Sequence, residues 1–214
     1  MPSRAWRFKS SLAHTVANNF ERQQAEKEFQ PQSLHELCAI LTRYRIAYEH
    51  WGSGGSKTVE QLYEELRTGE SFLIEDGREL LRVVHVASVS VFHFDGETLW
   101  RLVEDRQEFT NGDVRRRPFT SSVAEKIQKD EKPHAAALRG LCEELGVCSP
   151  VELKEEGVSV EAGASISYPG LHASVTLYKY LAFFSKEQFR PEGYVEVQDD
   201  KKTYFVWQPH TPLA

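Results

Sequence analysis

The chain has 214 residues and a formal net charge of −6, with hydrophobic residues at 40% and charged residues at 27%. This length and balance are typical of one globular domain with a sizeable core. The negative charge argues against a general nucleic-acid binder, although a local basic patch is compatible with it. No apolar run approaches membrane-spanning length and no secretory signal is recognised, so we expect no membrane partner.

The cysteines and the N-terminal composition bear on where the protein resides. Cys38, Cys142 and Cys148 are a sparse, odd set without zinc-knuckle spacing, which predicts reduced thiols and a cytoplasmic location. Residues 1–20 carry three basic residues and no acid, a composition similar to an organellar transit peptide. A basic arm that leads into a helix is the favoured interpretation, and organellar targeting is the alternative.

Two helices are predicted near the N-terminus. Residues 10–29 place apolar side chains at i, i+4 and i+8, with polar residues opposite. Pro31 ends this pattern. Ser33 and Glu36 form a capping box, which predicts a second helix extending through Tyr48.

Segment 51–58, WGSGGSKT, superficially matches a phosphate-binding loop. That pattern needs glycine immediately before the lysine and a strand before the loop. Ser56 stands in the glycine position and a helix precedes the segment, so we interpret it as a flexible connector. A further capping box at Thr58 and Gln61 predicts a short helix that ends at Gly69.

The hydrophobic period then changes to two. Residues 80–92 predict a long strand covered on both faces. The Asp95–Gly96 pair is a hairpin signal, with a return strand over residues 98–103. Asn111–Gly112 marks a second turn, and residues 114–119 predict a third strand.

The C-terminal part predicts further strands. Residues 158–162 alternate as an edge strand, and residues 172–184 form a long aromatic strand. A short helix is expected at 185–188 and an acidic loop at 191–200. Residues 204–207 predict a last strand or the entry to a final helix.

These elements indicate one α/β unit with mixed strands rather than alternating βα repeats. Residues 1–70 are expected to form a helical extension and residues 71–214 the main domain. His85 and His93 lie on the first long strand, and we interpret them as satisfied core or edge histidines rather than as ligands.

Residues 133–145 predict one helix with two faces. Pro133 suits the first turn because its missing N–H costs nothing there. Gly146 stands where helices end in a left-handed residue. An apolar stripe on one face is expected to be buried: Leu138, Leu141, Cys142 and Leu145.

The other face carries Arg139, Glu143 and Glu144. Arg139 and Glu143 are i, i+4 neighbours and can pair. The adjacent glutamates repel each other near the negative end of the helix dipole. A hard divalent cation would offset both effects, because Mg²⁺ takes carboxylate and phosphate oxygens. A solvated acidic face is the alternative interpretation.

The stretch EKIQKDEKPHAAALRGLCEELGV, residues 125–147, resembles a Nudix box, whose pattern is G-x5-E-x7-R-E-U-x-E-E-x-G-U with U a bulky apolar residue. Glu131 falls on the first glutamate, Arg139 on the arginine, and Glu143 and Glu144 on the paired glutamates. The order of strands before the helix is also that of Nudix domains. The resemblance implies a Nudix-like α/β/α sandwich with a mixed sheet and extra N-terminal helices.

Three features depart from the family pattern. Glu125 replaces the opening glycine, and Gly140 replaces the glutamate that follows the arginine. That family glutamate binds metal or acts as a base, which Gly140 cannot do, and a mid-helix glycine costs about 1 kcal/mol relative to alanine. Residues 115–126 also lack the usual Pro-Gly-Gly segment. The resemblance therefore supports the fold more strongly than the activity.

The resemblance implies an Mg²⁺- or Mn²⁺-dependent hydrolase of a diphosphate linked to another group, often a nucleoside diphosphate derivative. By that analogy Glu143 and Glu144 hold the metal, and Glu131 assists from the start of the helix or shapes the loop. Arg139 orients Glu143. Glu144 and Arg139 are thus the catalytic candidates of the box.

A base is needed in place of the missing carboxylate at position 140. Some family members take it from a late acidic loop. Glu196 is the first choice in the 191–200 segment, with Glu192 and Asp199 as alternatives.

The only compact basic run is Arg115–Arg117. Arg115 and Arg117 point the same way on a strand, and with Lys126 they could hold a diphosphate over the metal. A solvated strand balanced by the acidic segment 104–108 is an equal alternative.

A small phosphorylated molecule is therefore the expected partner, and a homodimer is left open. The rival hypothesis is a Nudix-like binding module without turnover, for a nucleotide, RNA or protein. A scaffold protein whose N-terminal helices mediate assembly is a third hypothesis. A fold hosts many functions, so the fold alone cannot decide among them.

Overall fold

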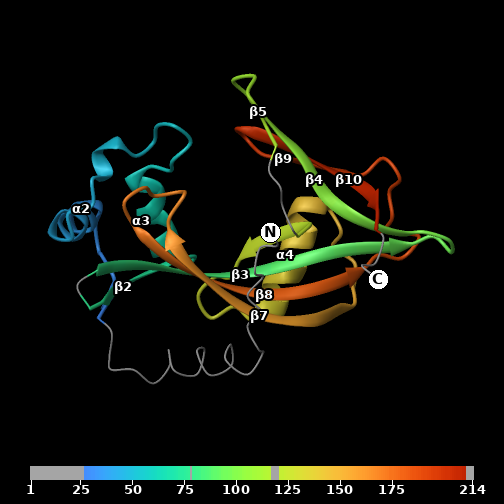
Figure 1. Cartoon of the computed structure of the whole chain (residues 1–214), viewed down its shortest axis with the longest axis horizontal. Coiled ribbons are helices and arrows are strands. Elements are labelled where there is room, and N and C mark those ends of the chain that lie inside the picture. Colours follow the sequence, from blue (N-terminus) through green and yellow to red (C-terminus); the bar gives the residue numbers. More distant parts are fainter. Residues whose placement is uncertain (1–26, 78, 117–120, 211–214) are drawn as a thin grey trace, which may run out of the picture. The chain divides into compact units, whose positions relative to one another are not determined.

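A computed structural model describes residues 27–77, 79–116 and 121–210 (Figure 1). The chain forms two compact units. The first consists of Met1–Val84 and Val158–Thr176, and the second of His85–Gly157 and Leu177–Ala214. The predicted boundary between residues 70 and 71 therefore lies inside the first unit. Strands β3 (Glu79–Phe94), β7 (Leu153–Ala164) and β8 (His172–Phe183) each contribute residues to both units.

The first unit combines short helices with antiparallel strands. Its further elements are β1 (Glu28–Phe29), α2 (Leu34–Arg43), the 3₁₀ turn η1 (Tyr48–His50), α3 (Val59–Thr68) and β2 (Phe72–Asp76). Strand β1 pairs with β2, and β2 pairs with the start of β3. Its core consists of buried side chains from all these parts: Phe29, Leu37, Leu41, Leu62, Leu73, Leu80, Tyr168 and Leu171.

The two predicted capping boxes begin helices as expected. The Ser33 hydroxyl accepts from the Glu36 backbone N–H at 3.2 Å. At α3, Thr58 Oγ1 accepts from the Gln61 N–H, and the Gln61 side chain accepts from the Thr58 N–H. Gly69 ends α3 in the left-handed region at φ 74°. Local hydrogen-bonding signals therefore placed both helix starts correctly.

Two helix predictions need correction. The second helix ends at Arg43 rather than Tyr48, because Arg45 turns to a positive φ of 58° and the Ile46 N–H bonds back to the Leu41 carbonyl. The helix expected over residues 10–29 lies mostly outside the described residues, but its last two are strand β1. They pair with β2, and Phe29 is buried in the core.

The second unit is built on an antiparallel sheet. It contains β4 (Leu99–Phe109), β5 (Val114–Arg115), β6 (Val123–Lys126), α4 (Pro133–Leu145), β9 (Tyr194–Val197) and β10 (Lys201–Pro209). Strand β4 pairs with β3, β5 and β10, while β6 pairs with β3 and β9 with β10. These elements confirm the α/β class, with a large antiparallel sheet and few helices.

Helix α4 covers one face of this sheet. On β3, Ala87, Val89 and Val91 join Ala137 and Leu141 of α4 in one buried cluster. The alternation along β3 sends its other residues to the opposite face. The predicted long strand and its Asp-Gly hairpin are thus confirmed, although β4 runs to Phe109.

Two C-terminal predictions are wrong. Residues 185–188 form a single turn, in which the N–H groups of Gln188 and Phe189 both donate to the Ser185 carbonyl. The predicted acidic loop 191–200 contains strand β9, since Tyr194–Val197 find partners on β10. No helix in the described part of the chain is long and apolar enough to cross a membrane.

Candidate functional site

Helix α4 spans the predicted residues, Pro133–Leu145, and Gly146 ends it at φ 65°. Its buried face differs from the predicted stripe. Leu141 and Leu145 are buried as expected, but Leu138 is only half-buried. The helix lies close against β6, and close packing needs small residues on the facing side. The buried small residues of α4 are Ala136, Ala137 and Gly140.

Arg139 is the centre of the polar face. Its Nε and Nη2 donate to the two Glu131 carboxylate oxygens at 3.0 and 2.9 Å. Nη1 donates to Glu125 Oε1 at 2.8 Å, and Nη2 also donates to the Lys126 carbonyl oxygen at 2.8 Å. The predicted partner Glu143 accepts at 3.4 Å, the longest of these contacts. Arg139 therefore joins the helix to β6 and to the loop at Glu131 more firmly than it orients Glu143.

Glu131 serves the loop before the helix. Both its oxygens bond Arg139, and one also accepts from the Gln128 backbone N–H at 3.0 Å. The pKa of Glu131 lies below its ordinary value, mainly because of the hydrogen bond from Arg139. Of its two predicted roles, metal ligand or loop support, these contacts favour loop support.

The paired glutamates have different environments. The Glu143 side chain is 57% exposed. Glu144 is partly buried, and burial together with the charges of Glu196, Glu125 and Glu104 raises the pKa of its carboxyl to about 8. A hydrogen bond with the Ala124 backbone opposes this shift. Glu144 thus lies near three other carboxylates, which reach it from β4, β6 and β9.

Glu196 is half-buried on β9, opposite Thr203 of β10, and its Oε1 accepts from the Gln198 side chain. Of the three charges that raise the Glu144 pKa, that of Glu196 has the largest effect. Glu192 and Asp199 are exposed. The structure therefore brings the first-choice base candidate near the box helix.

Two of these carboxylates were not predicted as site residues. Glu125 appeared only as a departure from the family glycine, and Glu104 only as part of an acidic segment. Neither has a local sequence signal for a site, because strand pairing between distant segments brings them to Glu144.

The donor set fits a hard divalent cation in its chemistry, since such ions prefer carboxylate oxygens. No group of three or more His, Cys, Asp or Glu side chains among the described residues is gathered at metal-binding spacing. Glu144, Glu125, Glu196 and the more exposed Glu143 are the residues that could hold the ion.

The predicted phosphate-binding residues are not brought together by the described contacts. Arg115 is exposed on edge strand β5, and Arg117 lies outside the described residues. Arg116 donates to the carbonyl oxygen of Asp105 and pairs with its carboxylate. For Arg116 this supports the alternative interpretation, a solvated strand whose charge is balanced by the acidic segment 104–108. Lys126 is half-buried, and its carbonyl oxygen supports Arg139.

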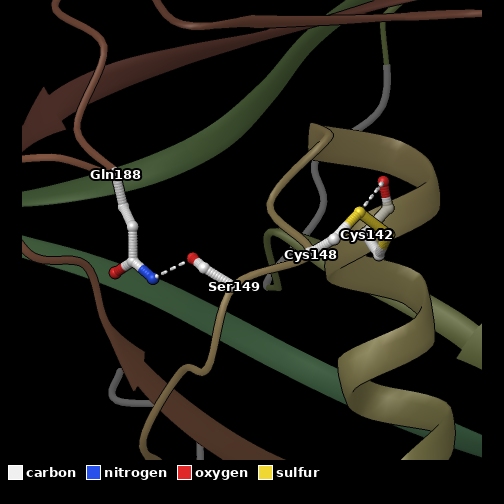
Figure 2. Close-up of a disulfide and its surroundings, with 4 residues drawn as sticks. All are labelled: Cys142, Cys148, Ser149 and Gln188. Atoms are coloured by element: carbon white, nitrogen blue, oxygen red, sulfur yellow. Dashed lines mark hydrogen bonds between the residues drawn. A yellow bond between two sulfur atoms is a disulfide. The ribbon is translucent and has the colours of Figure 1, made fainter.

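The cysteine prediction is wrong for two of the three residues. Cys142 and Cys148 form a disulfide across the end of α4, with their Cα atoms 4.4 Å apart (Figure 2). The Gln188 side-chain amide donates to the Ser149 hydroxyl at 2.9 Å, and Figure 2 draws this bond next to the disulfide. Cys142 is therefore not a reduced core residue, because the turn at Gly146 brings Cys148 back to it. Cys38 is free.

A separate cavity of about 310 Å³ lies in the second unit, away from these carboxylates. It opens on the sheet face of Ser88, Ser90 and Phe92, opposite the face that packs on α4. Arg101, Lys179 and Glu156 also line it. None of the predicted site residues lines this cavity.

The site thus has an arginine on helix α4 that holds Glu131 of the preceding loop, over an antiparallel sheet. No protein-family model and no curated protein matches the chain. Among solved structures it is similar to the Nudix domain of Shewanella oneidensis NrtR, complexed with ADP ribose, at 15% identity and a TM-score of 0.37. That similarity covers 59% of this chain and 72% of the other.

Two further structures are similar in the same sense. For the C. elegans Ap4A hydrolase the identity is 12% and the TM-score 0.35, over 59% of this chain and 80% of that one. For a MutT/nudix family protein from Enterococcus faecalis the identity is 17% and the TM-score 0.40, over 95% of this chain and 57% of that one. Identities and TM-scores are low in all three cases, so the chemistry must be judged from the residues of this chain.

Proposed function

We propose that this chain is a hydrolase of a diphosphate linked to another group, and that it uses Mg²⁺ or Mn²⁺ at Glu144. The proposal depends mainly on the environment of Glu144. Burial and three neighbouring carboxylates raise its pKa to about 8. A partly buried acid among like charges is costly in a structural role, and strongly perturbed carboxyls are typical of functional sites.

The residues would have distinct roles. The cation, when bound, supplies a Lewis acid that polarises a phosphoryl oxygen and lowers the pKa of a bound water. Glu144 holds it, and Glu196 is the base that accepts the proton of the attacking water. Arg139 positions Glu125 and Glu131 through the contacts described above.

The substrate class follows from the proposed metal chemistry and from the family that the chain resembles. A small phosphorylated molecule is the proposed partner, with nucleic acid and membrane not required. ADP ribose, seen with the NrtR domain, and a dinucleoside polyphosphate of the Ap4A type are suitable first probes. A homodimer is a further proposal that awaits measurement. The predicted cytoplasmic location stays a proposal without its original support, because it was based on reduced cysteines and Cys142 and Cys148 form a disulfide.

Binding without turnover is the second candidate function. Gly140 supplies no carboxylate, and the described His, Cys, Asp and Glu side chains form no group of three or more that could hold a metal ion. If the carboxylates do not gather around a cation, the chain would retain a Nudix-like surface for a ligand without the means to hydrolyse it.

The test is hydrolysis of both probes by the full chain with Mg²⁺ or Mn²⁺, with products separated by chromatography. Glu144→Gln keeps the shape and removes the charge, so turnover should fall by about a hundredfold or more, as for loss of one preorganised electrostatic group. Glu152→Gln is the matched control, because Glu152 is exposed beyond α4. Metal-independent binding of a probe without turnover would instead support the second candidate.

A further inference from the structure

The cavity of about 310 Å³ in the second unit results from a change of side-chain size across the sheet. On the sheet face opposite α4, β3 carries the small Ser88 and Ser90, whereas its neighbours β4 and β8 carry the longer Arg101 and Lys179. Small residues between long ones leave a hollow whose floor is β3. Its volume is at the lower end of the range for small-molecule sites, which is about 300–1,000 Å³. The cavity can therefore hold one small ligand.

One end of the cavity is aromatic. Phe92 lines it, and the Phe92 ring stacks on that of Phe183 with 5.7 Å between the ring centres. The His210 ring meets the Phe92 ring edge-on at 5.2 Å, and Leu181 adds an aliphatic wall. Phe183 is 51% exposed, so this apolar surface is not closed off from solvent. A planar ring fits this end, because aromatic groups are stabilised by stacked and edge-on contacts.

The two cations of the cavity lie on the strands next to β3. Arg101 is the cross-strand partner of Phe92, and its guanidinium carbon lies 6.0 Å from the centre of the Phe92 ring. Lys179 is half-buried on β8. Glu156 lines the same cavity, yet Lys179 forms no ion pair with it or with any other described residue. Two cations in one cavity of a chain with a net charge of −6 favour an anionic ligand.

The serine hydroxyls can contribute to the same anion site. Among the described residues, neither Ser88 nor Ser90 uses its hydroxyl in a hydrogen bond. Ser122 differs, since its hydroxyl donates to the Leu102 carbonyl oxygen at 2.6 Å and accepts from the Val91 N–H at 2.8 Å. A serine hydroxyl can rotate to donate to a phosphate or carboxylate oxygen. The polar part of the cavity thus supplies two charged donors and two neutral ones.

We propose that this cavity is a second ligand site, for a small molecule in which an anionic group, phosphate or carboxylate, is joined to a planar ring. Lys179 and Arg101 hold the anionic group together with the two serine hydroxyls, and the ring packs against Phe92. Glu156 is exposed, so solvent screens its charge and it weakens the anion site little. The site is independent of the proposed hydrolase activity, because it shares no residue with the carboxylate site.

Ligand-observed NMR titration of the full chain tests the site, with EDTA present so that no divalent cation contributes. The probes are phenyl phosphate and benzoate, with inorganic phosphate and phenol as the two separate halves. The better aryl anion should bind about tenfold more tightly than either half, because charge and ring are both recognised. The better probe also identifies the anionic group. Absence of aryl-anion binding, or equally tight binding of inorganic phosphate, would overturn the proposal.

Three variants place the binding in this cavity. Lys179→Gln removes one charged donor, so the affinity for the aryl anion should fall about tenfold. Ser90→Val fills the hollow with a residue that suits a strand, so binding should be lost while the Tm is kept. Lys186→Gln is the matched control, because Lys186 is exposed in the turn after β8 and does not line the cavity.

The comparison of the variants decides the outcome. Wild-type affinity in Lys179→Gln would show that the probe binds elsewhere and would overturn the site. An equal loss in Lys179→Gln and Lys186→Gln would show general charge attraction and would overturn it as well. Lys179→Gln decides alone if Ser90→Val lowers the Tm.

Discussion

Replacing Arg139 with alanine tests how the polar face of α4 is held. The side chain of Arg139 is only 23% exposed, and those of its partners Glu125 and Glu131 are 21% and 17% exposed. It makes four contacts of 3.0 Å or less, three to these carboxylates and one to the Lys126 carbonyl. Removing it leaves two largely buried acids without their cation.

The expected cost follows from that geometry. Breaking a buried ion pair by removing one partner costs about 3–5 kcal/mol, and a partly exposed pair costs less. We therefore expect Arg139→Ala to lower the free energy of unfolding by about 3 kcal/mol, measured by urea denaturation. Arg139→Lys keeps the charge but not the two-point contact with Glu131, so about half that loss is expected.

The pH dependence of the same variant gives a second readout. Arg139 holds the pKa of Glu131 below its ordinary value of 4.5. The stabilisation is therefore complete above about pH 5 and is lost as the pH falls through the lowered folded-state pKa. The difference between wild type and Arg139→Ala should shrink in acid. If Arg139→Ala lowers the free energy of unfolding by less than about 1 kcal/mol at pH 7, or if the difference from the wild type grows in acid, this account of Arg139 is refuted.

The remaining predictions concern stability. Reducing the Cys142–Cys148 disulfide, which spans six residues of sequence, should cost about 2 kcal/mol by loop-entropy reasoning, whereas Cys38→Ser should change little in thermal unfolding with and without reductant. Glu65→Gln should cost about 3 kcal/mol in urea denaturation, because Glu65 and Arg82 form a pair with side chains only 5% and 7% exposed. Its control Glu64→Gln breaks an exposed pair with Arg67 and should stay within about 0.5 kcal/mol. Deleting residues 1–50 should lower the Tm, because it removes Phe29, Leu37 and Leu41 from the core of the first unit, whereas deleting residues 1–26 keeps all three. An equal Tm for both deletions would contradict that role of β1 and α2.

Elements with local signals were predictable from the sequence. The caps at Ser33, Thr58 and Gly146 act through hydrogen bonds and backbone angles within a few residues. The long strand β3 has enough alternating β-branched residues to be recognised alone. Short strands such as β9 lack such a pattern, because their stability comes from a partner strand distant in sequence.

The candidate site was predictable only in part, for the same reason. The positions of Arg139 and Glu144 follow from helical spacing and the resembled pattern. The proximity of Glu104 and Glu125 to Glu144 depends on β4 and β6, so no local pattern could indicate it. The burial of Gly140 in place of Leu138 likewise depends on how close the helix lies to its strand.

The most direct test of the central claim is a crystal structure of the full chain grown with Mn²⁺ and a non-hydrolysable nucleoside diphosphate. The anomalous signal of manganese would locate the ion independently of any assumed ligand. We expect a peak within coordination distance of the Glu144 carboxylate, with the diphosphate beside it. A bound diphosphate without manganese at Glu144, or manganese held only by other residues, would contradict the account.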